Sequence, residues 1–241
     1  MGAGALLLAS PALADEPSLE AILTAVDDAG RQQASHAMAV MEVKTKRYER
    51  SMKMETWSQG TEKSLIRILE PAKDAGVTTL KVDENLWNYL PKVDRTMKVP
   101  AGMMSGAWMG SHLSNDDLVK EYRFSEDYDC ALTSTLAAEP ADLYVVACTP
   151  HEDTPVVWGR VEFTVRPDLV PKAQVFYDED GVKVRTMSFE DVQDIDGQPT
   201  AMTFRIEPHD KQGEYTVFKY LELDLSPDLD DGMFSLQSLK K

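Results

Sequence analysis

Basic residues are scarce in this sequence. It has 25 Lys and Arg against 41 Asp and Glu, which gives a formal net charge of -16 at pH 7. A surface of that sign repels nucleic acid and anionic lipid headgroups at long range. We therefore expect no nucleic-acid binding, while docking onto a basic patch of a partner protein stays open.

Long apolar runs are missing as well. The run over residues 3–8 is too short to span a bilayer, and Ala12-Leu13-Ala14 after it places small residues where a signal peptidase reads them. We expect residues 1–14 to be the remainder of a signal peptide, cleaved near Ala14. Residues 15–241 show no internal repeat or linker, and we predict that they form one soluble periplasmic domain.

Catalytic motifs are absent from the sequence. It contains no Gly-x-Ser-x-Gly, Gly-rich phosphate loop or His-Glu-x-x-His. The acidic run at Asp228, Asp230 and Asp231 lacks the Glu that closes an EF-hand loop. We predict no enzyme activity, no resident metal and no cofactor. The four histidines, which lack metal-ligand spacing, are His36, His112, His151 and His209.

Only two cysteines occur. Cys130 and Cys148 lie on either side of the Pro-containing turn LAAEPAD, and the midpoint between them falls inside that turn. In a symmetric hairpin the two residues would lie directly opposite each other, at a separation that suits a disulfide. In an oxidising periplasm we therefore predict a Cys130–Cys148 disulfide, and two cysteines without other ligands argue against zinc.

Strand patterns fill most of the remaining sequence. Tyr48, Met52 and Met54 alternate with charged residues, as in an antiparallel sheet with one wet face, whereas Ile66 and Ile68 lie in a run that is apolar on both faces. Two Asp-Gly pairs, at 180–181 and 196–197, and Lys211-Gln212-Gly213 predict hairpin turns. The expected strands are residues 36–45, 47–58, 62–71, 76–83, 85–91, 122–129, 130–134, 142–150, 156–165, 172–178, 182–192, 199–208 and 214–225.

Helical signals are few. Ser18 is the expected N-cap of a short amphipathic helix that ends at Gly30. Ser114 and Asp117 have capping-box spacing and predict a helix from Ser114 to about Tyr122. So many strands with so little helix predict a mainly β fold, a sheet that curls around a partly filled hollow. The final segment should pack Met233, Phe234 and Leu236 back onto the sheet.

A loop rich in Met and Trp follows the strand that contains Trp87 and Tyr89. It holds Met103, Met104, Trp108 and Met109, and Met adapts well to irregular apolar partners. We interpret this loop as a lid over an apolar cavity that should also be lined by Met52, Met54 and Trp87. Two alternatives are a loop that plugs its own core and a Cu(I) site made by the three methionines with His112.

The order of these elements resembles the outer-membrane lipoprotein-sorting (LolA/LolB-like) superfamily, and in particular a bacterial branch encoded beside resistance-nodulation-division type exporters. The resemblance implies an unclosed, strongly curved antiparallel sheet, or half-barrel, with a few short helices and a lid over its concave face. It also implies a cavity for acyl chains. The residues that carry it are Glu70-Pro71 with Gly76, Leu80, Leu86 to Pro91, Met109-Gly110-Ser111, Asn115 to Leu118 and Met233 to Leu236.

The sequence therefore predicts a monomeric periplasmic carrier. It would bind a lipid, a lipoprotein acyl chain or another long apolar molecule and pass it to or from a membrane partner such as an inner-membrane exporter. A sensor or interaction module that grips a partner protein is the main alternative, and a Met-rich Cu(I)-binding protein is the other. The expected ligand-binding residues are Met52, Met54, Ile66, Ile68, Trp87, Tyr89, Met103, Met104, Trp108 and Met109.

Overall fold

The computed structural model describes residues 17–29, 33–119, 123–137, 142–230 and 232–240. They form one antiparallel sheet of 13 strands in the order β6-β5-β4-β3-β2-β1-β13-β12-β11-β10-β9-β8-β7. The sheet is not closed, since β6 and β7 are its two edges. The strands are β1 (Ala34–Lys44), β2 (Glu49–Gln59), β3 (Lys63–Glu70), β4 (Thr78–Val82), β5 (Asn85–Leu90), β6 (Arg95–Lys98), β7 (Tyr128–Leu136), β8 (Leu143–Pro150), β9 (Arg160–Val165), β10 (Pro171–Tyr177), β11 (Lys183–Ile195), β12 (Gln198–Pro208) and β13 (Tyr215–Asp224).

The predicted mainly β fold is confirmed, with two local differences. The segment expected to be a strand over residues 122–129 instead contains the helical turn α3 (Phe124–Asp127), and β7 begins only at Tyr128. Part of the Met/Trp loop region is also strand, as β6. The hairpin turns at Asp180-Gly181, Asp196-Gly197 and Lys211–Gly213 lie where the sequence predicts them.

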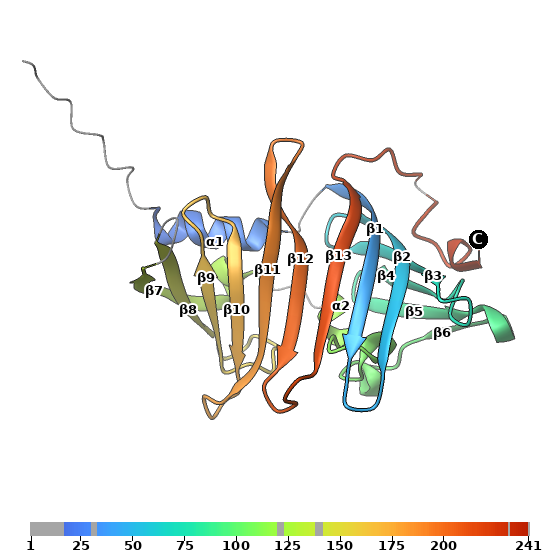
Figure 1. The fold of residues 1–241 in the computed structure, drawn as a ribbon, viewed down its shortest axis with the longest axis horizontal. Coiled ribbons are helices and arrows are strands. Elements are labelled where there is room, and N and C mark those ends of the chain that lie inside the picture. The colour runs from blue at the N-terminus through green and yellow to red at the C-terminus, as the bar shows by residue number, and fades with distance from the viewer. Residues whose placement is uncertain (1–16, 30–32, 120–122, 138–141, 231, 241) are drawn as a thin grey trace, which may run out of the picture.

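The sheet curls so that both of its ends lie behind the central strands in Figure 1. The two helices α1 (Leu19–Asp28) and α2 (Asn115–Val119) lie on that same, concave side. Ser18 caps α1 as predicted, and Gly30 lies outside the described residues, as does the predicted end of α2 near Tyr122. The helices therefore cover the concave face, as the resemblance implies.

The convex face is covered at one end by the C-terminal segment. Met233 and Phe234 pack against Trp57, Leu65 and Leu80 of β2, β3 and β4. This explains why the run around Ile66 is apolar on both faces, since β3 and β4 are covered on the concave side and on the convex side. The predicted packing of the segment is confirmed for these two residues, whereas Leu236 is 51% exposed.

The predicted disulfide joins β7 to β8. Cys130 and Cys148 are direct register partners with Cα atoms 4.1 Å apart, and their sulfur atoms are bonded. Replacing both cysteines with Ser should lower the free energy of unfolding by about 3 kcal/mol, because the bridge limits the unfolded chain over a loop of this length. Urea unfolding of the wild type and the double variant measures the difference. Equal stability under oxidising conditions would contradict this expectation.

No helix among the described residues has the length and apolar character needed to cross a membrane.

Candidate functional site

A row of large apolar side chains crosses the concave face. Residues directly opposite each other in antiparallel strands point to the same face, and Phe189, Phe204, Phe218, Met41 and Met52 are successive partners from β11 to β2. The Phe204 and Phe218 rings stack with centroids 4.7 Å apart. Met41 and Met52 are fully buried, whereas Phe189 and Phe204 are half-buried, so the row becomes partly exposed to solvent at β12 and β11.

Trp108 covers the buried end of this row. Its ring is 2% exposed and lies 6.4 Å, centroid to centroid, from the Phe218 ring. The indole N–H donates to Thr79 Oγ1 at 3.1 Å, so the polar edge of the ring is satisfied inside the core. The other side chains of this cluster, besides Met41 and Met52 of the row, include Met54, Ile66, Ile68, Met109, Leu113 and Leu118.

The segment that carries Trp108 is fixed to the end of the β1–β2 hairpin. The Tyr48 hydroxyl donates to the Gly110 carbonyl at 2.6 Å, and Arg50 donates to the Met109 carbonyl at 3.2 Å. Gly110 has φ +72°, and a Cβ built there would lie 2.8 Å from the Tyr48 hydroxyl. Both facts favour glycine at this position. Arg50 also pairs with Asp74 at 2.9 Å, which orients its guanidinium.

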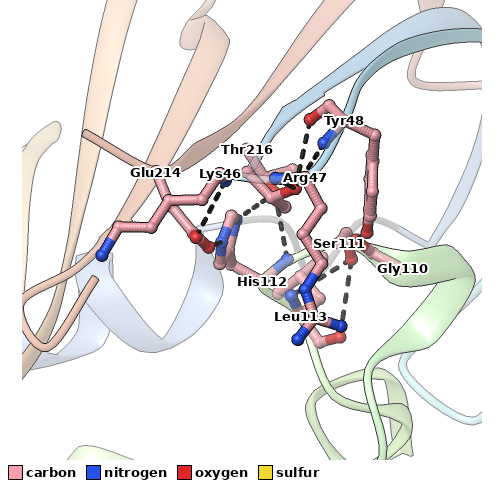
Figure 2. Close-up of polar contacts among 10 residues, drawn as sticks. Lys46, Arg47, Tyr48, Gly110, Ser111, His112, Leu113, Glu214 and Thr216 are labelled. Atoms are coloured by element: carbon pink, nitrogen blue, oxygen red, sulfur yellow. Dashed lines mark hydrogen bonds and ion pairs between the residues drawn. The ribbon is translucent and has the colours of Figure 1, made fainter. Parts of the chain in front are cut away.

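His112 connects the same segment to β13, as Figure 2 shows. Its ring nitrogens lie 2.8 Å from Thr216 Oγ1 and 3.2 Å from Glu214 Oε2, and the backbone N–H of Lys46 donates to the other Glu214 oxygen at 3.0 Å. The Lys46 N–H and then the His112 ring lower the pKa of Glu214. The His112 side chain is only 7% exposed, so it serves as a structural anchor.

The predicted capping box at the start of α2 is confirmed. Ser114 N–H donates to Asp117 Oδ2 at 2.8 Å, and Asp117 N–H donates to Ser114 Oγ at 3.1 Å. Replacing Ser114 with Ala should lower the free energy of unfolding by about 1 kcal/mol, because Asp117 N–H loses its acceptor. Thermal unfolding monitored by circular dichroism measures this. Loss of ligand uptake without any loss of stability would instead give Ser114 a functional role.

Asp117 also joins α2 to β11. Arg185 donates two hydrogen bonds to its carboxylate, at 2.8 and 2.7 Å, and the guanidinium lies over the rings of Phe176 and Trp158. Burial raises the pKa of Asp117, but the hydrogen bonds and charge of Arg185, together with Ser114, outweigh burial and lower that pKa overall. This buried ion pair links β11 to residues 108–119, which we call the cover because Trp108 closes the buried end of the apolar row.

Helix α1 covers the other end of the concave face. Ile22, Leu23 and Val26 pack on residues of β8, β9 and β10, with Phe124 of α3 in the same cluster. Asp27 is 3% exposed and accepts hydrogen bonds from the N–H groups of Phe124 and Ser125, at 2.7 and 3.0 Å. The end of α1 thereby accepts the first N–H groups of α3, which joins these two helices to each other.

Between these two covered regions lies a strip that keeps part of its surface exposed. We define the central strip as Met187, Phe189, Phe204 and Tyr220, all half-buried. Met187 packs on the cluster that contains Ile22, Leu23 and Val26 of α1, while Phe204 and Tyr220 pack on the Trp108 cluster. The strip therefore connects the two clusters. Burial raises the pKa of Tyr220, and its hydroxyl makes no hydrogen bond with the residues that the structure describes. The strip is thus aromatic and apolar, with one phenol available as a polar contact.

The structure brings six of the ten predicted ligand-binding residues together: Met52, Met54, Ile66, Ile68, Trp108 and Met109. Trp87 does not share their space, which corrects that expectation. Trp87 and Tyr89 are on the opposite, convex face, under the C-terminal segment. In the loop itself, Met103 is 62% exposed and Met104 is half-buried without joining the Trp108 cluster.

The geometry gives no support to the copper alternative. Both ring nitrogens of His112 are engaged by Thr216 and Glu214. Met103 is 62% exposed and does not belong to the cluster that holds Met109.

Met187, Phe189, Phe204 and Tyr220 of the central strip are not among the ligand-binding residues that the sequence predicts. The signal was present as period-two alternation, with Met202, Phe204 and Ile206 in one strand and Phe218 and Tyr220 in the next. The pairing of β11 with β12, and of β12 with β13, aligns these side chains into one surface. That pairing depends on register and cannot be read from the alternation alone.

Comparison with known proteins agrees with this architecture. A family model described as "uncharacterized protein"-like matches residues 60–241. A search of curated protein sequences finds no match.

Three solved structures share the fold over most of their length. A DUF1329 family protein from Desulfovibrio piger has a TM-score of 0.80 at 24% identity, covering 90% of this chain and 96% of that one. A protein from Vibrio parahaemolyticus, described as an outer-membrane lipoprotein-sorting protein domain, has a TM-score of 0.76 at 22% identity, covering 91% and 98%. A LolA superfamily protein from Nitrosomonas europaea has a TM-score of 0.72 at 24% identity, covering 91% and 98%. The chain thus belongs to the family that the matching model describes, and it shares the fold of the LolA superfamily protein and of the two other solved structures.

Proposed function

We propose that this chain is a periplasmic carrier that binds a long apolar molecule, such as a lipid or a lipoprotein acyl chain, on the central strip. It would then pass this cargo to or from a membrane partner. The observation that carries the proposal is the strip itself, since Phe189, Phe204 and Tyr220 keep surface between two covered regions of a curved sheet. Apolar surfaces of this kind bind apolar ligands without catalysing a reaction.

The energetics suit an acyl chain. Each methylene removed from water contributes about 0.8 kcal/mol, so a chain of ordinary length lying along the strip needs no ionic contact to bind. The Tyr220 phenol offers one polar contact to a carbonyl or hydroxyl near the end of such a chain. The strip has no charged side chain of its own, which suits a neutral tail better than an ionic ligand.

The Trp108 cluster would form the wall of this site. Met52, Met54 and Ile68 are almost fully buried beneath Trp108, so they would contact cargo only if the cover moved. The cover is held by polar contacts, from Tyr48, His112 and the Asp117–Arg185 pair. In the proposed function, these contacts keep the Trp108 cluster closed to water, and they would rearrange only if cargo reached beneath the cover.

The charge of the chain supports transfer to a partner protein and not to a bare membrane. At -16, it is repelled by anionic headgroups. We propose that the partner is a membrane protein with a basic docking patch, for which an inner-membrane exporter is our candidate.

Binding of a fluorescent fatty-acid probe tests the proposal. Phe204→Ser should weaken binding by about 1.5–3 kcal/mol through lost burial. The matched control is Leu221→Ser, because Leu221 lies on the neighbouring strand, is 53% exposed, and does not belong to the strip. Far-UV circular dichroism checks that both variants fold. Equal affinity of the two variants, or no probe binding by the wild type, would contradict the carrier proposal.

The alternative of a sensor or interaction module predicts a different result. A protein partner that stays bound in stoichiometric amount after lipid extraction, with no apolar probe binding, would favour that alternative.

A further inference from the structure

The outer strand β7 is an unusual sheet edge. Within the described part of the chain it pairs with β8 only, and residues 131–136 are all exposed. Leu132 and Leu136 are 41% and 47% exposed. The stretch from Cys130 to Leu136, CALTSTL, has no charged residue and no proline.

Other strand edges of this sheet carry features that block pairing with another chain. The opposite edge, β6, is short and contains Arg95 and Lys98. In the middle of the sheet, β12 and β13 pair only over Thr203–Ile206 and Thr216–Lys219. Beyond those pairs, β12 contains Pro199 and β13 contains Glu222 and Asp224. Charges and proline are the usual means of blocking an edge, and the stretch of β7 from Cys130 to Leu136 lacks both.

The β7 edge is also held rigid. The Cys130–Cys148 disulfide bonds it to β8, and at the one irregular position the Thr133 hydroxyl donates to the Val145 carbonyl at 3.1 Å. A fixed edge loses little conformational entropy when another strand adds to it. An exposed strand edge without charge presents unpaired backbone N–H and C=O groups and is a template for pairing with another chain.

We infer that β7 is a docking edge for an extended segment of a partner protein, uncharged at its centre and basic at its ends. Backbone hydrogen bonds to β7 would supply most of the affinity. The flanking charge follows from Asp129, whose side chain is 90% exposed at the start of β7, and from exposed Asp142 where the chain returns. A second copy of this chain fits less well, because antiparallel pairing would bring acidic ends together in two molecules of charge -16. This inference does not depend on the central strip.

A designed peptide tests the edge directly. The probe has about nine residues, alternating Thr and Val at its centre with Lys at both ends. We expect it to bind the full chain and to slow hydrogen exchange of the amides over residues 130–136. A peptide with Glu in place of Lys should bind about tenfold more weakly, because it meets Asp129 and Asp142.

Two pairs of substitutions localise the binding. Leu132→Lys with Leu136→Lys should reduce affinity for the Lys-flanked peptide about tenfold or more, since edge lysines block strand addition. The control, Val93→Lys with Leu221→Lys, adds the same charge at positions that are 66% and 53% exposed elsewhere, and should leave affinity within about twofold. The inference would be overturned if both pairs of substitutions reduced peptide affinity equally, or if the peptide did not bind at all. It would also be overturned by slowed hydrogen exchange outside β7, or by self-association through β7 seen in sedimentation.

Discussion

Replacing Trp108 with Ala is expected to lower the free energy of unfolding by about 3–5 kcal/mol. The ring is 2% exposed above fully buried Met52 and Met54, so its loss leaves a cavity that these side chains cannot fill. The variant also removes the donor to Thr79. Urea unfolding followed by circular dichroism measures the change.

Met103→Ala is the matched control for this prediction. Met103 lies in the same loop but is 62% exposed, so its truncation should change stability by no more than about 0.5 kcal/mol. Similar small effects of both substitutions would mean that Trp108 is not part of the core, and the cover would then be a loosely held flap.

Arg185→Ala should be destabilising by about 3–5 kcal/mol, because it leaves the buried carboxylate of Asp117 without its cation. The control is Arg166→Ala. Arg166 also makes a two-pronged pair, with Asp168 at 2.9 and 2.7 Å, but both side chains are about 40% exposed. Its removal should cost about 1 kcal/mol or less. Equal costs for the two variants would show that the Asp117–Arg185 pair contributes nothing beyond an exposed pair.

The same pair predicts a pH dependence. The pKa of Asp117 is lowered in the folded protein, so the folded state favours the ionised form. The resulting stabilisation is therefore fully present above the unfolded pKa of about 3.9 and is lost as pH falls through the lower folded value. Arg185→Ala should lose less stability than the wild type between about pH 4 and pH 2. Parallel stability curves for the two proteins over that range would contradict this.

Local features of the fold could be predicted from sequence because neighbouring residues determine them. The Ser114–Asp117 capping box and the Asp196-Gly197 turn depend on spacing within a few residues. The Cys130–Cys148 disulfide follows from the symmetry of one hairpin.

Two features that depend on contacts between distant segments could not be predicted. Phe124 to Asp127 form a helical turn because Asp27, nearly a hundred residues earlier, caps it. Alternation put Trp87 and Tyr89 on one face of β5, but that face is the convex one only because of the register from β2 to β5.

The candidate site likewise contains residues that the sequence predicts and residues that it does not. The unusual composition of the Met/Trp loop predicts a lid over an apolar cavity. Trp108 and Met109 do pack over Met52 and Met54, but Trp108 is buried there, as in the alternative of a loop that plugs its own core. The central strip could not be found in this way. Phe189 and Phe204 are ordinary members of alternating strands, and only the pairing of β11 with β12 shows that they form one surface.

Native mass spectrometry of the gently purified protein tests the carrier proposal most directly. We expect a species heavier than the polypeptide by the mass of one apolar molecule that organic extraction removes, and reloading when the stripped protein is incubated with phospholipid. Phe204→Ser should carry and reload less of that molecule than Leu221→Ser does. A spectrum showing the polypeptide mass alone, before and after incubation with lipid, would contradict the proposal that the central strip binds cargo.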